Sequence, residues 1–158
     1  MSSTNISDRG LNGAMQLKML SFVINRIQEA VLVCDADGRI CLVNLASCEE
    51  LGYTEENLLQ MSVTEVLTSL DTTQWQMDWQ VLQHQQSMIR ETHIRNSDAT
   101  TIPVEIQANY FVDSGQQYCV LLIRNLSAHL EMLEKLREQE LQFRQLVKNS
   151  PDIFIRYD

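Results

Sequence analysis

Hydrophobic residues near the start of the chain follow two different periods. One apolar stripe has the spacing of a helix face: Leu17, Leu20, Ile24, Ile27 and Val31. The run from Ala30 to Cys34 is then continuously apolar, and a second apolar run at residues 40–43 follows a turn that ends in Gly38. The pattern predicts an amphipathic helix over residues 14–29 and a β-hairpin over residues 30–43.

Capping residues divide the middle of the chain into several helices. Asn44 precedes a short apolar helix, and Gly52 follows it as a residue that readily takes the left-handed conformation of a helix end. Thr54 and Ser62 are the next caps. A longer helix is expected over residues 71–86, and its apolar face holds Trp75, Trp79 and Leu82.

Three strands are expected in the second half of the chain. They cover residues 88–95, 102–112 and 118–123, and a turn at Ser114 and Gly115 joins the last two. The continuously apolar residues 118–123 predict a strand that is buried on both faces. The order of elements predicts an α+β fold with a five-stranded antiparallel sheet. Short helices would cover one face, and the N-terminal helix or a partner would cover the other.

The helical period returns at Leu126 and fits a heptad repeat. The a positions are Leu126, Leu133, Glu140 and Val147, and the d positions are His129, Leu136 and Phe143. Residues 128–148 are therefore expected to form a linker helix that pairs as a coiled coil. A monomeric amphipathic helix is the alternative.

The two ends of the chain carry further expectations. Residues 1–13 are rich in small polar residues and are expected to be disordered. Residues 143–158 repeat the pattern of residues 20–35 at a fixed offset, because each segment is a helix end that runs into an apolar strand closed by aspartate. Residues 149–158 are therefore expected to be the truncated start of a second copy of the same domain.

Composition excludes several classes of function. The chain has 158 residues but only 5 glycines, and no two of them have the spacing of a nucleotide-binding loop. The net charge of −9 is concentrated in residues 31–126, so that block would repel nucleic acid. The 4 cysteines have no metal-site spacing, and no metal site is expected. The chain has neither a signal pattern nor a membrane-length apolar run, so a cytoplasmic location is expected.

Residues 22–128 resemble a PAS sensor domain of bacterial multidomain signalling proteins. The segments that carry the resemblance are Ala30–Ile40, Val43–Asn44, Leu51–Leu58, Ile102–Glu105 and Ile123–Ser127. The domain would cover residues 30–127. Two positions depart from the family pattern: Ala99 replaces a turn glycine, and Asn125 begins a hinge that often reads Asp-Ile-Thr.

The resemblance implies a ligand pocket between the sheet and the short helices. Pocket candidates are Trp75 and Trp79, which could stack on a flavin, His84, which could ligate haem, and Asn44. A pocket without a cofactor is the expected state, and flavin or haem is the alternative. The covalent flavin motif of light sensors is missing, as is the sequence around a kinase phosphoacceptor histidine at His129.

The function implied is a sensory and dimerisation module that is not itself an enzyme. Arg124, Asn125 and Ser127 would relay a signal to an output domain beyond Asp158, either a histidine kinase or an enzyme of cyclic-di-GMP signalling. A homodimer is expected through the flanking helices, with Leu17, Leu20, Ile24 and Ile27 as its seam. The competing hypothesis is a cofactor-loaded redox, gas or light sensor, and no nucleic acid, membrane or metal partner is expected.

Overall fold

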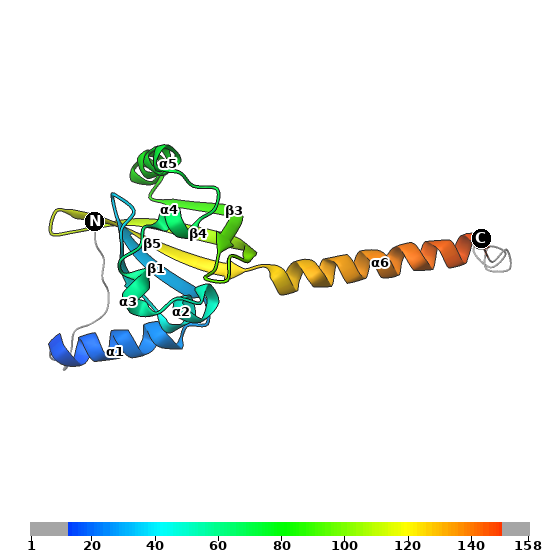
Figure 1. Cartoon of the computed structure of the whole chain (residues 1–158), viewed down its shortest axis with the longest axis horizontal. Coiled ribbons are helices and arrows are strands. Elements are labelled where there is room, and N and C mark those ends of the chain that lie inside the picture. Colours follow the sequence, from blue (N-terminus) through cyan, green and yellow to red (C-terminus); the bar gives the residue numbers. More distant parts are fainter. Residues whose placement is uncertain (1–12, 150–158) are drawn as a thin grey trace.

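The computed structural model describes residues 13–149, which fold into an α+β domain with a long helix at each end (Figure 1). Disorder is predicted for residues 1–13: residues 1–12 lie outside the described residues, but Gly13 is already helical. The second copy predicted at residues 149–158 lies outside the described residues from residue 150 on. The helices are α1 (Gly13–Arg26), α2 (Leu45–Leu51), α3 (Glu55–Leu58), α4 (Val63–Val66), α5 (Thr72–Gln85) and α6 (Ser127–Asn149). The strands are β1 (Ala30–Asp35), β2 (Ile40–Val43), β3 (Ser87–Arg95), β4 (Thr101–Asp113) and β5 (Gln116–Asn125).

The five strands form one antiparallel sheet in the order β2-β1-β5-β4-β3, which confirms the predicted fold class. The first and last strands of the sequence are thus neighbours in the centre, while β2 and β3 are the edges. Residues on the inner face alternate along each strand, as in Val104, Ile106 and Ala108, and form one core with the short helices.

The predicted capping residues begin and end the short helices. The side chains of Asn44, Thr54, Ser62 and Asp71 each accept a hydrogen bond from a backbone N–H in the first turn of the following helix. Gly52 ends α2 at φ +74°, and a Cβ at this position would collide with Ser97. These contacts confirm the helix starts that were predicted from the capping residues.

Ala99, where the family pattern has glycine, is indeed in a left-handed conformation, with φ +61°. The turn around it is held by Asn96, whose Oδ1 accepts hydrogen bonds from the backbone N–H groups of Asp98 and Thr100 at 3.1 and 2.9 Å. A left-handed conformation costs a non-glycine residue about 1–2 kcal/mol. The turn chemistry of Asn96 therefore holds a strained alanine in place.

Two predictions are wrong, one about packing and one about the end of a helix. The strand at residues 118–123 is not buried on both faces: Cys119, Leu121 and Ile123 are buried in the core, but the residues between them are only half-buried. The outer face is left open because α1 lies beside α2 and the β2 edge (Figure 1). Helix α1 also ends at Arg26, not at residue 29, and Val31 belongs to β1.

Helix α6 projects away from the body of the domain (Figure 1). It has no buried residue, although Leu133, Leu136 and Phe143 are among its exposed apolar side chains. Only its first turns contact the domain, through β4. The helix therefore presents an apolar stripe that the described part of the chain does not cover. None of the described helices is apolar over a length that could cross a bilayer.

Candidate functional site

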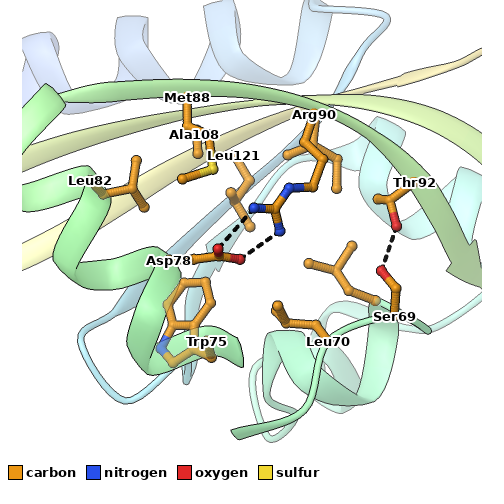
Figure 2. Close-up of a pocket in the computed structure, with 12 residues that line it drawn as sticks. Ser69, Leu70, Trp75, Asp78, Leu82, Met88, Arg90, Thr92, Ala108 and Leu121 are labelled. Atoms are coloured by element: carbon orange, nitrogen blue, oxygen red, sulfur yellow. Dashed lines mark hydrogen bonds and ion pairs between the residues drawn. The ribbon is translucent and has the colours of Figure 1, made fainter. Parts of the chain in front are cut away.

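A small cavity lies between helix α5, the loop after α4 and the inner face of the sheet (Figure 2). Its volume is about 50 Å³, which is room for a few water molecules. Leucine, methionine, alanine and isoleucine side chains form most of its wall. The lining residues are Leu67, Ser69, Leu70, Trp75, Asp78, Leu82, Met88, Arg90, Thr92, Ile106, Ala108 and Leu121.

An ion pair between Asp78 of α5 and Arg90 of β3 lies in this apolar cavity. The guanidinium is bidentate: Nη1 donates to Oδ2 at 2.7 Å and Nη2 donates to Oδ1 at 2.8 Å. Gln74 donates a third hydrogen bond to Oδ1 at 3.0 Å. The hydrogen bonds to Asp78 raise the pKa of Arg90, so the guanidinium stays charged at any physiological pH.

The two partners of this pair differ in exposure. The Asp78 side chain is 11% exposed, whereas that of Arg90 is 42% exposed. Asp78 is fixed on a helix whose face is packed in the core. Arg90 extends from an edge strand at the mouth of the cavity. The Asp78 carboxylate is therefore held in the cavity, whereas the Arg90 guanidinium covers it from the solvent side.

A second polar contact closes the cavity beside the ion pair. The hydroxyls of Ser69 and Thr92 are 2.6 Å apart (Figure 2). Thr68 strengthens the same junction, because its backbone N–H and its hydroxyl both donate to the carbonyl of His93, at 3.2 and 3.1 Å. The loop between α4 and α5 is thus attached to the edge strand β3 by polar contacts that water can replace.

Trp75 lines the cavity, but Trp79 does not. The Trp75 indole N–H donates to the carbonyl of Ala36 at 2.9 Å, which fixes the ring. Trp79 packs between Trp75 and Tyr110, with ring centroids 5.7 Å from each. Trp79 therefore supports the wall from behind, and only Trp75 could contact a bound molecule.

The structure does not place His84 in the cavity. Its side chain lines a shallow groove on the outer side of α5, with Met77 and Gln80. Cofactor pockets usually enclose about 300–1,000 Å³, far more than this cavity offers. Neither haem nor flavin fits the cavity as it stands, because the axial ligand faces elsewhere and the second tryptophan is occupied in the core.

Asn44, another predicted pocket residue, lies outside the cavity and joins three parts of the chain. Its Oδ1 accepts hydrogen bonds from the backbone N–H of Val31 and of Ser47, at 2.9 and 3.0 Å. Its Nδ2 donates to the carbonyls of Ile24 and Glu29, at 3.1 and 3.0 Å. The buried amide thus connects α1 and its linker to β1 and α2.

The predicted relay residues lie where β5 meets α6. Asn125 caps α6, because its Oδ1 accepts from the backbone N–H of Ser127 at 2.8 Å, and its Nδ2 donates to the Glu50 carboxylate of α2. Arg124 pairs with Glu105 of the neighbouring strand at 3.2 Å. An aspartate at position 125, as in the family pattern, would face Glu50 with a like charge, so asparagine suits this chain.

The predicted seam on α1 is accessible. The exposed fractions of Leu17, Leu20 and Ile27 are 70%, 50% and 39%, and Ile24 is half-buried. Leu17, Leu20 and Ile24 also line a groove between α1 and the β2 edge. Within the described chain, this stripe contacts little beyond α2.

Sequence reasoning missed Asp78 and Arg90, the central residues of the site. One signal was present: Asp78 lies three residues after Trp75 and four before Leu82, and so falls on the apolar face of α5. Arg90 likewise occupies an inward position of β3, between Met88 and Thr92. A charge on each of two apolar faces predicts a buried ion pair, because a lone buried charge is unstable.

The cysteines belong to the core more than to any site. Cys34 and Cys119 are buried partners in the β1–β5 register. Hydrogen bonding to Cys119, followed by burial, raises the pKa of Cys34, which keeps the thiol protonated and unreactive. Among residues 13–149, no cluster of metal-ligating side chains is large enough to hold a metal ion.

The chain is similar to a known family of domains. The family model described as the PAS fold matches residues 18–125. A solved PAS domain of a two-component sensor histidine kinase is 20% identical, with a TM-score of 0.65, and the match covers 72% of this chain and 99% of that one. The PAS domain of an HTR-like protein from Haloarcula marismortui is 26% identical, with a TM-score of 0.66 and coverage of 70% and 91%. A search of curated proteins gives no match.

The PAS domain of nitrogen regulation protein NR(II) from Vibrio parahaemolyticus is also similar. It is 19% identical, with a TM-score of 0.57, and the match covers 68% of this chain and 97% of that one. Identities at this level show a shared fold and say nothing of a shared ligand.

The Asn44 amide predicts a selective effect of Asn44→Asp. The aspartate keeps the acceptor for Val31 and Ser47 but places a carboxylate against the carbonyls of Ile24 and Glu29. We expect the free energy of unfolding to fall by about 2–3 kcal/mol, as for a buried group that loses its partners. Hydrogen exchange should also show α1 detaching before the rest of the domain.

The matched control is Asn25→Ala, which removes one exposed hydrogen bond between α1 and α2, the one that the Leu45 N–H donates to Asn25 Oδ1. It should lower the free energy of unfolding by about 1 kcal/mol or less. Equal effects of the two substitutions in urea unfolding would contradict the role given to Asn44.

Proposed function

Because this chain belongs to the PAS family, we propose that it is a sensory and dimerisation module of a signalling protein. In this proposal the cavity between α5 and the sheet receives the signal and α6 passes it to an output domain. The segment itself would have no catalytic residue. A cytoplasmic histidine kinase or an enzyme of cyclic-di-GMP signalling is the proposed type of parent protein.

The observation that carries the proposal is the junction at the end of β5. Asn125 connects α2 to the first turn of α6 in one side chain, and the backbone N–H of Leu126 donates to the Pro103 carbonyl of β4 at 2.9 Å. A movement of the sheet relative to α2 must therefore change the direction or the fraying of α6. This is the mechanical property that a relay requires.

A physical path leads from the cavity to this junction. Ser69, Arg90 and Thr92 line the cavity, and the same three residues line a groove that ends under Leu126, His129 and Leu130 at the start of α6. A change in the position of Arg90 would therefore alter both the cavity and the groove. This shared wall supports the proposal that occupancy of the cavity biases α6.

Dimerisation is supported by the apolar surface on both flanking helices. Leu20 of α1, Ile27 just after α1, and Leu133, Leu136 and Phe143 of α6 are exposed. Apolar stripes of this kind are typically buried against a partner helix. We place the seam on α1, continued by α6 as a coiled coil.

In the proposed relay, Asn125→Asp keeps the hydrogen bond that caps α6 and loses the one that joins residue 125 to Glu50 of α2. The aspartate still accepts the hydrogen bond from Ser127, but it repels Glu50. Losing one hydrogen bond of about 1 kcal/mol should speed amide exchange in α2 and in the first turns of α6 roughly fivefold.

Asn109→Asp, at a half-buried position of β4 away from α6, is the control for Asn125→Asp and should leave the exchange of α6 unchanged. Unchanged exchange in Asn125→Asp would contradict the relay.

The dimer is checked by sedimentation. We expect the wild-type chain to sediment as a dimer, and Leu20→Glu and Ile24→Glu to weaken the association at least tenfold, because a buried seam does not accept an unpaired charge. Lys18→Glu introduces the same side chain on the other side of α1 and should associate as the wild type does. A monomeric wild type would contradict the dimer, and two variants that stay dimeric would move the seam to α6.

A further inference from the structure

Asp78 has the properties of a preformed binding group. Its carboxylate is nearly buried and accepts hydrogen bonds from Gln74 and from both terminal nitrogens of Arg90. The helix that carries it cannot withdraw it, since Trp75 and Leu82 on the same face are buried in the core. Arg90, in contrast, reaches in from an edge strand on a flexible side chain.

From this asymmetry we propose that the cavity binds a small organic cation, a primary alkylammonium or alkylguanidinium, which replaces the Arg90 guanidinium on Asp78. The inference rests on the proposed sensory function and names the ligand class of the same cavity. No covalent step is involved, because the ligand exchanges one ion pair for another.

The charge of the ligand follows from the burial of Asp78. A molecule that pairs with Asp78 in the cavity has to displace Arg90 from the carboxylate (Figure 2). A neutral or anionic molecule would then leave a buried carboxylate without a counter-charge, which is strongly unfavourable. A cation restores the pair, and the acidic block of residues 31–126 raises the local concentration of cations.

The shape of the ligand follows from the rest of the wall. Leu82, Met88, Ala108 and Leu121 form an apolar recess behind the carboxylate (Figure 2). The Trp75 ring forms another side of the cavity. With a volume of about 50 Å³ plus the space that Arg90 vacates, the recess suits a chain of a few carbons and no large ring.

The displaced Arg90 would carry the signal. The groove that it also lines contains Glu91 and Glu105, and it extends under His129 in the first turn of α6. Glu105 is already paired with Arg124 at 3.2 Å, so Glu91 is the acidic partner in this groove for a guanidinium released from Asp78. Binding of the cation would move a positive charge from the cavity toward the relay helix.

The test uses the two tryptophans of the chain as reporters, since each gives one indole N–H signal in a nitrogen–proton NMR spectrum and only Trp75 lines the cavity. n-Butylammonium chloride is titrated at constant ionic strength, with sodium butyrate and 1-butanol as isosteric anionic and neutral controls. We expect a saturable shift of the Trp75 signal with butylammonium, and at least tenfold weaker binding of both controls.

Variants of Asp78 and of Arg90 test the role of each partner of the ion pair separately. Asp78→Asn keeps the shape but removes the charge and should weaken butylammonium binding at least tenfold. Arg90→Ala removes the internal competitor and should strengthen it about tenfold. If Arg90→Ala fails to fold, Arg90→Lys, which cannot form the bidentate pair, should still bind butylammonium more tightly than the wild type.

Equal binding of butyrate and butylammonium, or unchanged binding in Asp78→Asn, would overturn the inference. A Trp75 signal that does not respond to butylammonium would do so as well. These results would leave the relay at Asn125 untouched, because that relay is measured by hydrogen exchange without ligand. Conversely, butylammonium binding together with unchanged amide exchange in Asn125→Asp would contradict the relay but not the binding of the cation.

Discussion

The buried carboxylate of Asp78 must keep a cationic partner, and this requirement organises the site. Arg90 satisfies it from an edge strand, with two charge-assisted hydrogen bonds of 2.7 and 2.8 Å. The pair joins α5 to β3 across a cavity that is mostly apolar. Because one partner is fixed and the other is exposed, the contact is strong enough to close the cavity and can still be exchanged.

Two asparagines connect the domain to its two flanking helices. Asn44 holds α1 and its linker against β1 and α2, and Asn125 holds α2 against the start of α6. Both are neutral amides that donate and accept at once, so each joins elements that a carboxylate would push apart. Helix α2 thus lies between the two flanking helices, and a shift of the sheet beneath it would reach both.

Local chemistry made much of the fold predictable. Asn44 and Asp71 cap helices because their side chains satisfy free N–H groups, and the alternation in β4 requires only that one face be buried. The site was harder to predict, because the Asp78–Arg90 pair joins two apolar faces that are brought together only by tertiary packing. The burial of β5 was overestimated for the same reason: Val120 is apolar, but the position of α1 leaves its side of the sheet uncovered.

Hydrogen exchange in Asp78→Asn tests most directly whether Arg90 links the state of the cavity to α6. This variant releases a guanidinium that remains charged and can move toward Glu91. We expect slower exchange in the first two turns of α6, and a return to the wild-type rate in the double variant Asp78→Asn/Arg90→Met, which has no guanidinium to move. Unchanged exchange in Asp78→Asn, or a double variant that behaves like the single one, would contradict this link.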